Sequence, residues 1–283
     1  MPTARIDNCE VAFEESGPRH APTVVLLHGF LGCNEDWQVI REALDERLHI
    51  VAVDLPGHGR TRAARFPDDY SIDGACRLLD GLFDRLALPQ FVLAGYSMGG
   101  RIALAFALRS RSRLRGLLLE SASPGIAGAA ERQQRLIDDE QRAQILEHDG
   151  LAAFVRAWES QPLFASQHSA PPAALATQRE LRLRGDAHEL AASLRAAGTG
   201  GQPWLGDHLA SLALPLLLIT GSLDTRFCAI ARQMLAALPD ARCITAEGAG
   251  HNVHLEQPQF FAGALADFAD RLAHTNDNQG VRP

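Results

Sequence analysis

The sequence contains no lysine. All 27 basic residues are arginine, and 34 aspartates and glutamates outnumber them, which gives a net charge of −7. A chain of this charge lacks the basic surface that phosphate groups require, so nucleic acid is not expected as a partner. Because arginine also occupies positions where another chain could have lysine, the presence of an arginine is not by itself evidence of a specific binding role. An argument about any one arginine must therefore rest on its position.

Other shortages exclude further classes of protein. The five cysteines form no Cys-x-x-Cys pair and show no metal-ligand spacing, so we expect no metal site and reduced thiols. No apolar run approaches the roughly 18 residues of a membrane span. The first residues, MPTARIDNCEVAFEES, include acidic residues and no apolar segment of the kind found in signal peptides. We expect a cytoplasmic protein without a membrane partner, and its oligomeric state is not indicated.

Short apolar runs alternate with helical patterns along most of the chain. Such alternation is typical of buried parallel strands joined by crossover helices. The expected strands cover 23–27, 49–53, 91–94, 116–119, 214–219 and 241–245. The expected helices cover about 36–46, 71–86, 98–109, 227–237 and 258–272. This pattern predicts an α/β fold with a mostly parallel, doubly wound sheet.

The alternation stops between residues 126 and 206. Leu151, Phe154, Val155 and Trp158 follow helical spacing there, and a second amphipathic run extends from Leu175 to Leu194. A helical insertion between two strands of one sheet predicts a cap over the carboxyl ends of the strands. The predicted division is a core of residues 1–125 and 207–273, a cap of residues 126–206, and a disordered tail of residues 274–283.

Residues 95–99 read Gly-Tyr-Ser-Met-Gly. They follow the expected strand at 91–94 and precede an expected helix. A Gly-x-Ser-x-Gly sequence in that context predicts a nucleophile elbow, a sharp turn that exposes its serine at the edge of an α/β-hydrolase sheet. Ser97 is therefore the first candidate catalytic residue.

A catalytic serine needs a base and an acid, which follow it in this fold in the order Asp or Glu, then His. Asp224 comes after the expected strand at 214–219, and His251 comes after the last expected strand. The predicted triad is Ser97, Asp224 and His251. His254 is disfavoured because it falls where the last helix is expected to begin. Glu120, at the end of another strand, stays open as a competing acid.

Two backbone N–H groups are expected to form an oxyanion hole beside Ser97. One belongs to Met98, the residue after the serine, and the other to Phe30, in the loop after strand 23–27. Arg101 follows Ser97 by one helical turn, so it would place a permanent cation on the same face of the helix. Ordinary ester hydrolysis does not require that cation.

Seven segments together resemble the 2-succinyl-6-hydroxy-2,4-cyclohexadiene-1-carboxylate (SHCHC) synthase family of menaquinone biosynthesis. They are LLHGFLGCNEDW, DLPGHGRT, GYSMGGRIAL, ESASPGI, ERQQR, GSLDTRF and GAGHNVHLEQP. The resemblance extends from about residue 24 to residue 260 and includes the cap. It implies an α/β-hydrolase fold and a lyase without a cofactor that eliminates pyruvate from an enolpyruvyl cyclohexene carboxylate. Ser97 would then act as a base, with His251 accepting charge and Asp224 orienting His251.

The resemblance also implies a pocket for a small substrate with three carboxylates. The family's pocket positions correspond here to Arg101, Arg135, Arg182, Tyr96 and Trp158. The third arginine belongs to the segment RELRLR, in which Arg179 and Arg184 stay open beside the preferred Arg182. A guanidinium group suits this task because its planar fork matches a carboxylate.

Two other functions compete with the lyase. A serine hydrolase would use Ser97 as a covalent nucleophile on a small carboxylated ester, thioester or carbon–carbon substrate. A ligand-binding module on the same fold would have no activity. Arg101 favours the lyase over the hydrolase, since an unpaired buried cation gains nothing in an apolar acyl pocket. The complete set of Ser97, Asp224 and His251 argues against the silent module.

Overall fold

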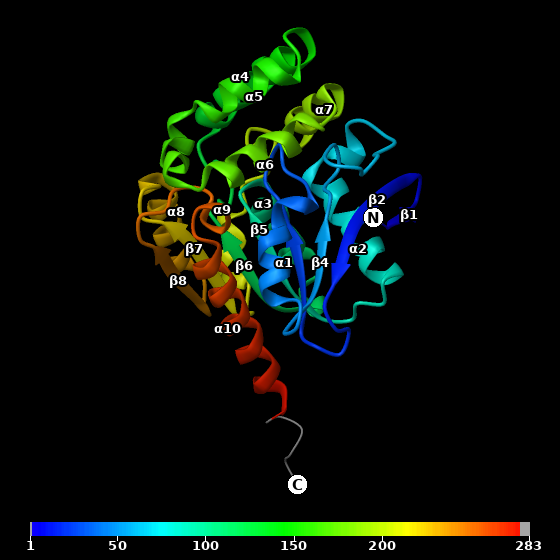
Figure 1. The fold of residues 1–283 in the computed structure, drawn as a ribbon, viewed down its shortest axis with the longest axis vertical. Coiled ribbons are helices and arrows are strands. Elements are labelled where there is room, and N and C mark those ends of the chain that lie inside the picture. Colours follow the sequence, from blue (N-terminus) through cyan, green and yellow to red (C-terminus); the bar gives the residue numbers. More distant parts are fainter. Residues whose placement is uncertain (1, 278–283) are drawn as a thin grey trace.

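The computed structural model describes residues 2–277, which form an eight-stranded sheet flanked by helices (Figure 1). The spatial order of the strands is β1-β2-β4-β3-β5-β6-β7-β8. Their bounds are β1 Thr3–Ile6, β2 Cys9–Ser16, β3 Thr23–Leu27, β4 His49–Val53, β5 Phe91–Tyr96, β6 Leu114–Glu120, β7 Leu216–Gly221 and β8 Ala241–Ala246. The pairings from β4 through β8 are all parallel. The predicted α/β class with a mostly parallel sheet is confirmed.

The two strands that the apolar runs did not predict are β1 and β2. They pair with each other antiparallel, and β2 joins the sheet antiparallel to β4. In β2 the acidic residues Glu10, Glu14 and Glu15 stand among apolar residues, so the strand contains no long continuous apolar run. Antiparallel strands at one side of a sheet are less completely buried than central parallel strands, so their apolar signal is weaker.

Helices cover both faces of the sheet. Helices α1 (Gln38–Leu44) and α10 (Pro258–Asp277) supply apolar side chains to the core on one face. Helices α2 (Ile72–Arg85), α3 (Met98–Arg109) and α8 (Thr225–Ala237) supply them to the core on the other face. Helix α10 continues past the expected end at residue 272, so residues 274–277 are helical, contrary to the predicted tail. The rest of that tail, 278–283, lies outside the described residues.

The segment between β6 and β7 contains the helices that gather at one end of the sheet in Figure 1. They are α4 Ala129–His148, α5 Leu151–Glu159, α6 Pro172–Leu183 and α7 Ala187–Ala197. The run expected from Leu175 to Leu194 is thus two helices, because the chain leaves α6 at Gly185 and Asp186 caps α7. Apolar side chains of α4, α5 and α7 pack with Leu31 of the core. The cap limits of 126 and 206 stay a prediction.

No helix among residues 2–277 is long and apolar enough to cross a membrane. All five cysteines are free thiols.

Two buried histidines lie beneath the sheet's carboxyl edge. The Nδ1 of His28 lies 2.7 Å from the carbonyl oxygen of Gly29, and its Nε2 accepts the N–H of Leu55 at 3.0 Å. The ring of His58 lies 5.1 Å from that of His28. Burial lowers the pKa of His28 to about 3, helped by His58, and the pKa of His58 to about 4. Both imidazoles are therefore neutral at physiological pH.

We expect these two histidines to destabilise the fold as the pH falls. Each has a folded pKa below its unfolded value of about 6.5, so the unfolded chain takes up protons first. Their contribution is fully present above pH ~6.5 and is lost as the pH falls toward the folded values. Substitution of His58 by Gln should lower the slope of unfolding free energy against pH by about 1.4 kcal/mol per pH unit near pH 5. Denaturant unfolding at several pH values measures this slope.

His20→Gln is the matched control, since His20 is exposed and its replacement should leave the slope unchanged. Burial raises the pKa of Asp36 to about 6, and this carboxyl acts in the opposite direction in the same range of pH. Asp36 is present in the parent protein and in both variants, so its contribution to the slope cancels when the variants are compared with the parent. A slope that His58→Gln does not alter would contradict the prediction.

Candidate active site

Ser97 lies in a strained turn between β5 and α3. Its backbone has φ 50° and ψ −107°, a left-handed conformation that is costly for a residue with a side chain. The N–H of Ser97 donates to the carbonyl oxygen of Glu120 at 2.9 Å. A Cβ at Gly99 would lie 2.4 Å from the carbonyl oxygen of Leu27, so only glycine allows the turn to pack against β3. The neighbouring strands thereby hold Ser97 at the edge of the sheet.

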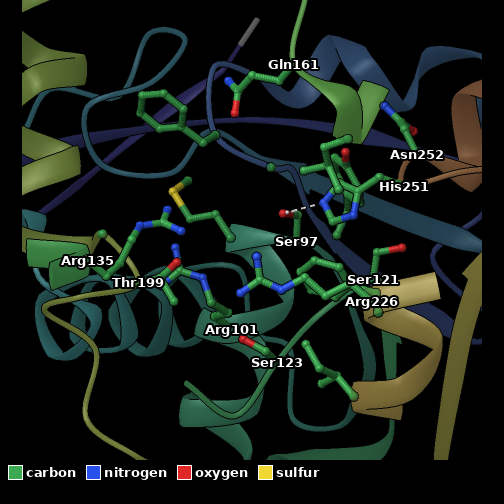
Figure 2. Close-up of a pocket in the computed structure, with 18 of the residues that line it drawn as sticks. Ser97, Arg101, Ser121, Ser123, Arg135, Gln161, Thr199, Arg226, His251 and Asn252 are labelled. Carbon is green, nitrogen blue, oxygen red and sulfur yellow. Dashed lines mark hydrogen bonds between the residues drawn. The ribbon is translucent and has the colours of Figure 1, made fainter. Parts of the chain in front are cut away.

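Ser97, His251 and Asp224 form one hydrogen-bonded chain. The Nε2 of His251 lies 3.0 Å from the Oγ of Ser97, the contact drawn as a dashed line in Figure 2. The Nδ1 of His251 lies 2.7 Å from the Oδ2 of Asp224. The carboxylate is acceptor only, so Nδ1 carries the proton of this bond and Nε2 is free to accept one from Ser97. His251 and Asp224 are both buried.

Glu120 and His254 form a second carboxylate–histidine pair behind the first. One oxygen of Glu120 lies 2.7 Å from Nδ1 of His254, and the other accepts the N–H of His254 at 3.0 Å. The indole of Trp37 packs 4.1 Å from the His254 ring. Both carboxylate oxygens are thus engaged with His254. The geometry favours Asp224 over Glu120 as the partner of His251.

The N–H groups of Met98 and Phe30 lie where an oxyanion hole is expected. Met98 is the first residue of α3, so its N–H has no acceptor within the helix. None of the hydrogen bonds recorded among residues 2–277 uses the N–H of Phe30. His28 fixes the carbonyl of Gly29 just before Phe30. Both residues line the cavity in front of Ser97. Their role as oxyanion donors stays a prediction.

A cavity of about 630 Å³ lies between the sheet edge and the cap. The predicted pocket residues all line it: Arg101, Arg135, Arg182, Tyr96 and Trp158. Figure 2 shows Arg101 and Arg135 on one side of Ser97 and His251 on the other. Within the described chain, no group of three His, Cys, Asp or Glu side chains is arranged to hold a metal ion.

The choice among the arginines of α6 and its end follows from burial. Arg182 is buried, lines the cavity, and lies with its guanidinium carbon 5.8 Å from the centre of the Phe164 ring. Arg179 and Arg184 are exposed and do not line the cavity; they pair with Glu159 and Glu35. The geometry therefore favours Arg182 as the arginine that meets a ligand.

Arg101 is a buried cation without an acidic partner. It donates to the side-chain oxygen of Gln202 at 2.9 Å, and it forms no ion pair with any residue between 2 and 277. Burial, with repulsion from Arg135, lowers the pKa of Arg101 to about 10. The group is still charged at neutral pH. A buried charge without a counterion is costly, so an anionic ligand would bind favourably beside it.

The cap arginines, in contrast, are held by acids. The Nε of Arg135 lies 2.7 Å from Asp139, which is buried and also accepts from Arg142 at 3.2 Å. An Nη of Arg182 lies 3.1 Å from Glu159. These contacts orient the two guanidinium groups and leave part of each free for a ligand, since one guanidinium has five donors.

Asp36 and Arg226 are among the cavity residues that the sequence analysis did not single out. Asp36 accepts the N–H of Cys33 at 3.3 Å and lines the cavity beside Gly32. Arg226 lies in the segment GSLDTRF, two residues after Asp224, and lines the cavity from the first turn of α8. The position of Arg226, two residues after Asp224, could have indicated a place in the site. It was not singled out because arginines are frequent in this chain.

Comparison with known proteins agrees with the fold. The alpha/beta hydrolase fold family matches residues 22–258. A Bacillus subtilis (strain 168) protein named "Putative 2-succinyl-6-hydroxy-2,4-cyclohexadiene-1-carboxylate synthase" is 39% identical over 263 residues, 93% of this chain and 95% of that protein. The 2-succinyl-6-hydroxy-2,4-cyclohexadiene-1-carboxylate synthase of Serratia proteamaculans (strain 568) is 34% identical over 255 residues, 90% of this chain and 95% of that protein. The structure of MenH from S. aureus is 33% identical, with a TM-score of 0.88, and the match covers 93% of this chain and 98% of that one. A malate-bound thermophilic esterase from Thermogutta terrifontis is 26% identical, with a TM-score of 0.81 and coverage of 95% and 97%.

We expect the two carboxylate–histidine pairs to differ in their effect on the reactivity of Ser97. Asp224→Asn leaves His251 without an anion and with the wrong tautomer, and comparable changes cost a factor of roughly 10³ to 10⁴. Labelling of Ser97 by a small fluorophosphonate should slow by about that factor. Glu120→Gln should slow it only a few-fold. Intact-mass spectrometry follows the label, and equal losses in the two variants would refute the assignment of Asp224.

Proposed function

The chain belongs to the 2-succinyl-6-hydroxy-2,4-cyclohexadiene-1-carboxylate synthase family of the alpha/beta hydrolase fold, and we propose that Ser97, His251 and Asp224 carry out its reaction. The enzyme is a carbon–oxygen lyase of menaquinone biosynthesis. It eliminates pyruvate from 2-succinyl-5-enolpyruvyl-6-hydroxy-3-cyclohexene-1-carboxylate. The observation that carries the assignment of the site is Arg101, a buried and uncompensated cation one turn from Ser97.

The elimination begins at ring carbon 2, whose proton is acidified by the adjacent succinyl carbonyl. Removal of that proton forms the double bond between carbons 2 and 3, and the double bond between carbons 3 and 4 moves to carbons 4 and 5. The bond between carbon 5 and the ether oxygen breaks. The leaving group is the enolate of pyruvate, which takes a proton at its methylene carbon. No acyl-enzyme is required.

Ser97 is positioned to be the base. Its Oγ lies 3.0 Å from Nε2 of His251, which takes the serine proton as the hydroxyl accepts the ring proton. Asp224, at 2.7 Å from Nδ1, stabilises the imidazolium that forms. The charge that develops on the succinyl carbonyl oxygen lies within reach of two N–H donors, which we assign to Phe30 and Met98.

The cavity supplies cations for the substrate's three carboxylates. A carboxylate that leaves water for a covered cavity must be paired and hydrogen-bonded. Arg101 from the core and Arg135 and Arg182 from the cap contribute cations to this pairing. We assign Tyr96 and Trp158 to the walls that contact the ring. The proposed partner is therefore a small polycarboxylate, and the free thiols support a cytoplasmic location.

The same triad could hydrolyse a small carboxylated ester, thioester or carbon–carbon substrate. The similar esterase has the same fold, and the hydrogen-bonded chain from Ser97 to Asp224 suits a nucleophile as well as a base. Arg101 argues against an apolar acyl group at the pocket, because such a group would leave the buried charge unpaired.

We expect the purified protein to release pyruvate from the enolpyruvyl cyclohexene carboxylate. Lactate dehydrogenase with NADH measures the pyruvate, and the absorbance of the conjugated diene measures the second product. Ser97→Ala should slow both by about 10³-fold or more, since it removes the proton acceptor. Fast turnover of p-nitrophenyl esters through an acylated Ser97, without pyruvate release, would establish the hydrolase instead.

We expect Arg101→Ala to affect charged and neutral substrates differently. Loss of a charge-assisted contact of about 1.5–3 kcal/mol should lower kcat/KM for the tricarboxylate roughly 10- to 100-fold. Residual hydrolysis of a neutral p-nitrophenyl ester should change less than about 3-fold. Arg109→Ala on the same helix is the control, since Arg109 is paired with Asp73 at the surface. Equal losses on both substrates would show that Arg101 is structural.

A further inference from the structure

Arg226 has no assigned role, and its side chain lines the cavity beside the triad. It is the second residue of α8, and in Figure 2 its side chain extends into the cavity from the side of His251. No hydrogen bond or ion pair of Arg226 is recorded among the residues that the structure describes. Its side chain is exposed, so it lies where the cavity opens to solvent.

The position of Arg226 is unfavourable within the chain itself. A 13-residue helix has a partial positive charge at its N-terminus, and a cation in the first turn is repelled by it. The acid at that terminus, Asp224, is occupied by the N–H of Phe227 and by His251. An anion in the cavity would offset the repulsion between Arg226 and the N-terminus of α8. Neither Asp224 nor any other described carboxylate forms an ion pair with Arg226.

The arginines of the cavity fall into two groups. Arg135, Arg142 and Arg182 come from the cap, and each is paired with an acid of the cap. Arg101 and Arg226 come from α3 and α8, the two helices that begin at the catalytic residues, and neither has an ion pair among residues 2–277. These two are therefore the cavity arginines whose charge no described acid neutralises. Arg101 is buried, and Arg226 is open to solvent.

We propose that Arg226 binds the carboxylate of the enolpyruvyl group, the part of the substrate that leaves as pyruvate; this inference rests on the proposed function. The leaving group must reach solvent after the bond to ring carbon 5 breaks. An exposed cation at the mouth suits an anion that departs, whereas the buried Arg101 and Arg182 suit carboxylates that stay with the ring. Arg226 is a specificity-determining residue and transfers no proton.

The test compares Arg226→Gln with Arg232→Gln, a control at an exposed arginine of the same helix that does not line the cavity. Arg226→Gln should raise KM for the substrate about 10-fold and raise the inhibition constant of pyruvate by a similar factor. Inhibition by succinate, which matches the succinyl arm, should change less than 2-fold by the same argument. Arg226→Lys should recover part of the loss. Arg232→Gln should behave as the parent protein.

Pyruvate binding can also be measured without turnover. In the Ser97→Ala background, quenching of tryptophan fluorescence reports the affinity for pyruvate, because Trp158 lines the cavity. Addition of Arg226→Gln should weaken that affinity about 10-fold and leave the affinity for succinate unchanged.

Three outcomes decide the matter. Unchanged pyruvate binding in the Arg226→Gln variant overturns the inference. Equal weakening of pyruvate and succinate overturns the assignment to the leaving group, because it shows a general effect of charge. A parent protein that releases no pyruvate overturns the proposed function, whereas an active parent with an unaffected Arg226→Gln variant overturns only this inference.

Discussion

The left-handed backbone of Ser97 is the constraint on which the site depends. An isolated serine avoids this conformation, at a cost of about 1–3 kcal/mol. Here the N–H of Ser97 is fixed by the carbonyl of Glu120 on β6, and Gly99 packs against the end of β3. Three parallel strands thus hold one turn. This turn also fixes where α3 begins, and therefore the positions of the Met98 N–H and the Arg101 guanidinium.

The charges of the cavity follow a division between core and cap. The core supplies arginines without acids, and the cap supplies arginines whose acids hold them in place. A ligand that satisfies both groups must lie between the two layers and carry several negative charges. Asp139 accepts from Arg135 and Glu159 accepts from Arg182, so these two acids orient the cap guanidinium groups toward fixed positions.

Much of this arrangement could be predicted from the sequence because strong local signals mark it. Buried parallel strands are short apolar runs, so β3 and β4 were predicted at their observed bounds. The strands β1 and β2 were missed because polar residues interrupt their apolar positions, so neither strand is a continuous apolar run. The amphipathic run at 175–194 hid a break at Gly185, since apolar spacing continues across it.

The residues of the site likewise fall into those that motifs predict and those that only the structure identifies. The elbow and the loops after β7 and β8 have motifs, so Ser97, Asp224 and His251 could be named in advance, and the structure brings them within hydrogen-bond distance. The choice between Asp224 and Glu120 needed the observation that Glu120 is occupied by His254. The choice of Arg182 over Arg179 and Arg184 needed the observation that only Arg182 is buried. Arg226 and Asp36 lie within segments that the sequence analysis quoted, but only the cavity shows that their side chains line the site.

The same triad can serve hydrolysis or elimination, and the surrounding charges bias the choice. A serine oxygen beside an imidazole can attack a carbonyl carbon or accept a proton from a neighbouring carbon, and the bound geometry selects between them. An ester hydrolase positions its substrate by an apolar acyl group and leaves the carbonyl carbon over the serine. Arg101 from the core and Arg135 and Arg182 from the cap line the same cavity as Ser97, and in the proposed function they would hold the substrate by its carboxylates rather than by apolar groups. A ring anchored in that way would present its edge to Ser97, and the nearest atom would then be a hydrogen on carbon rather than a carbonyl carbon.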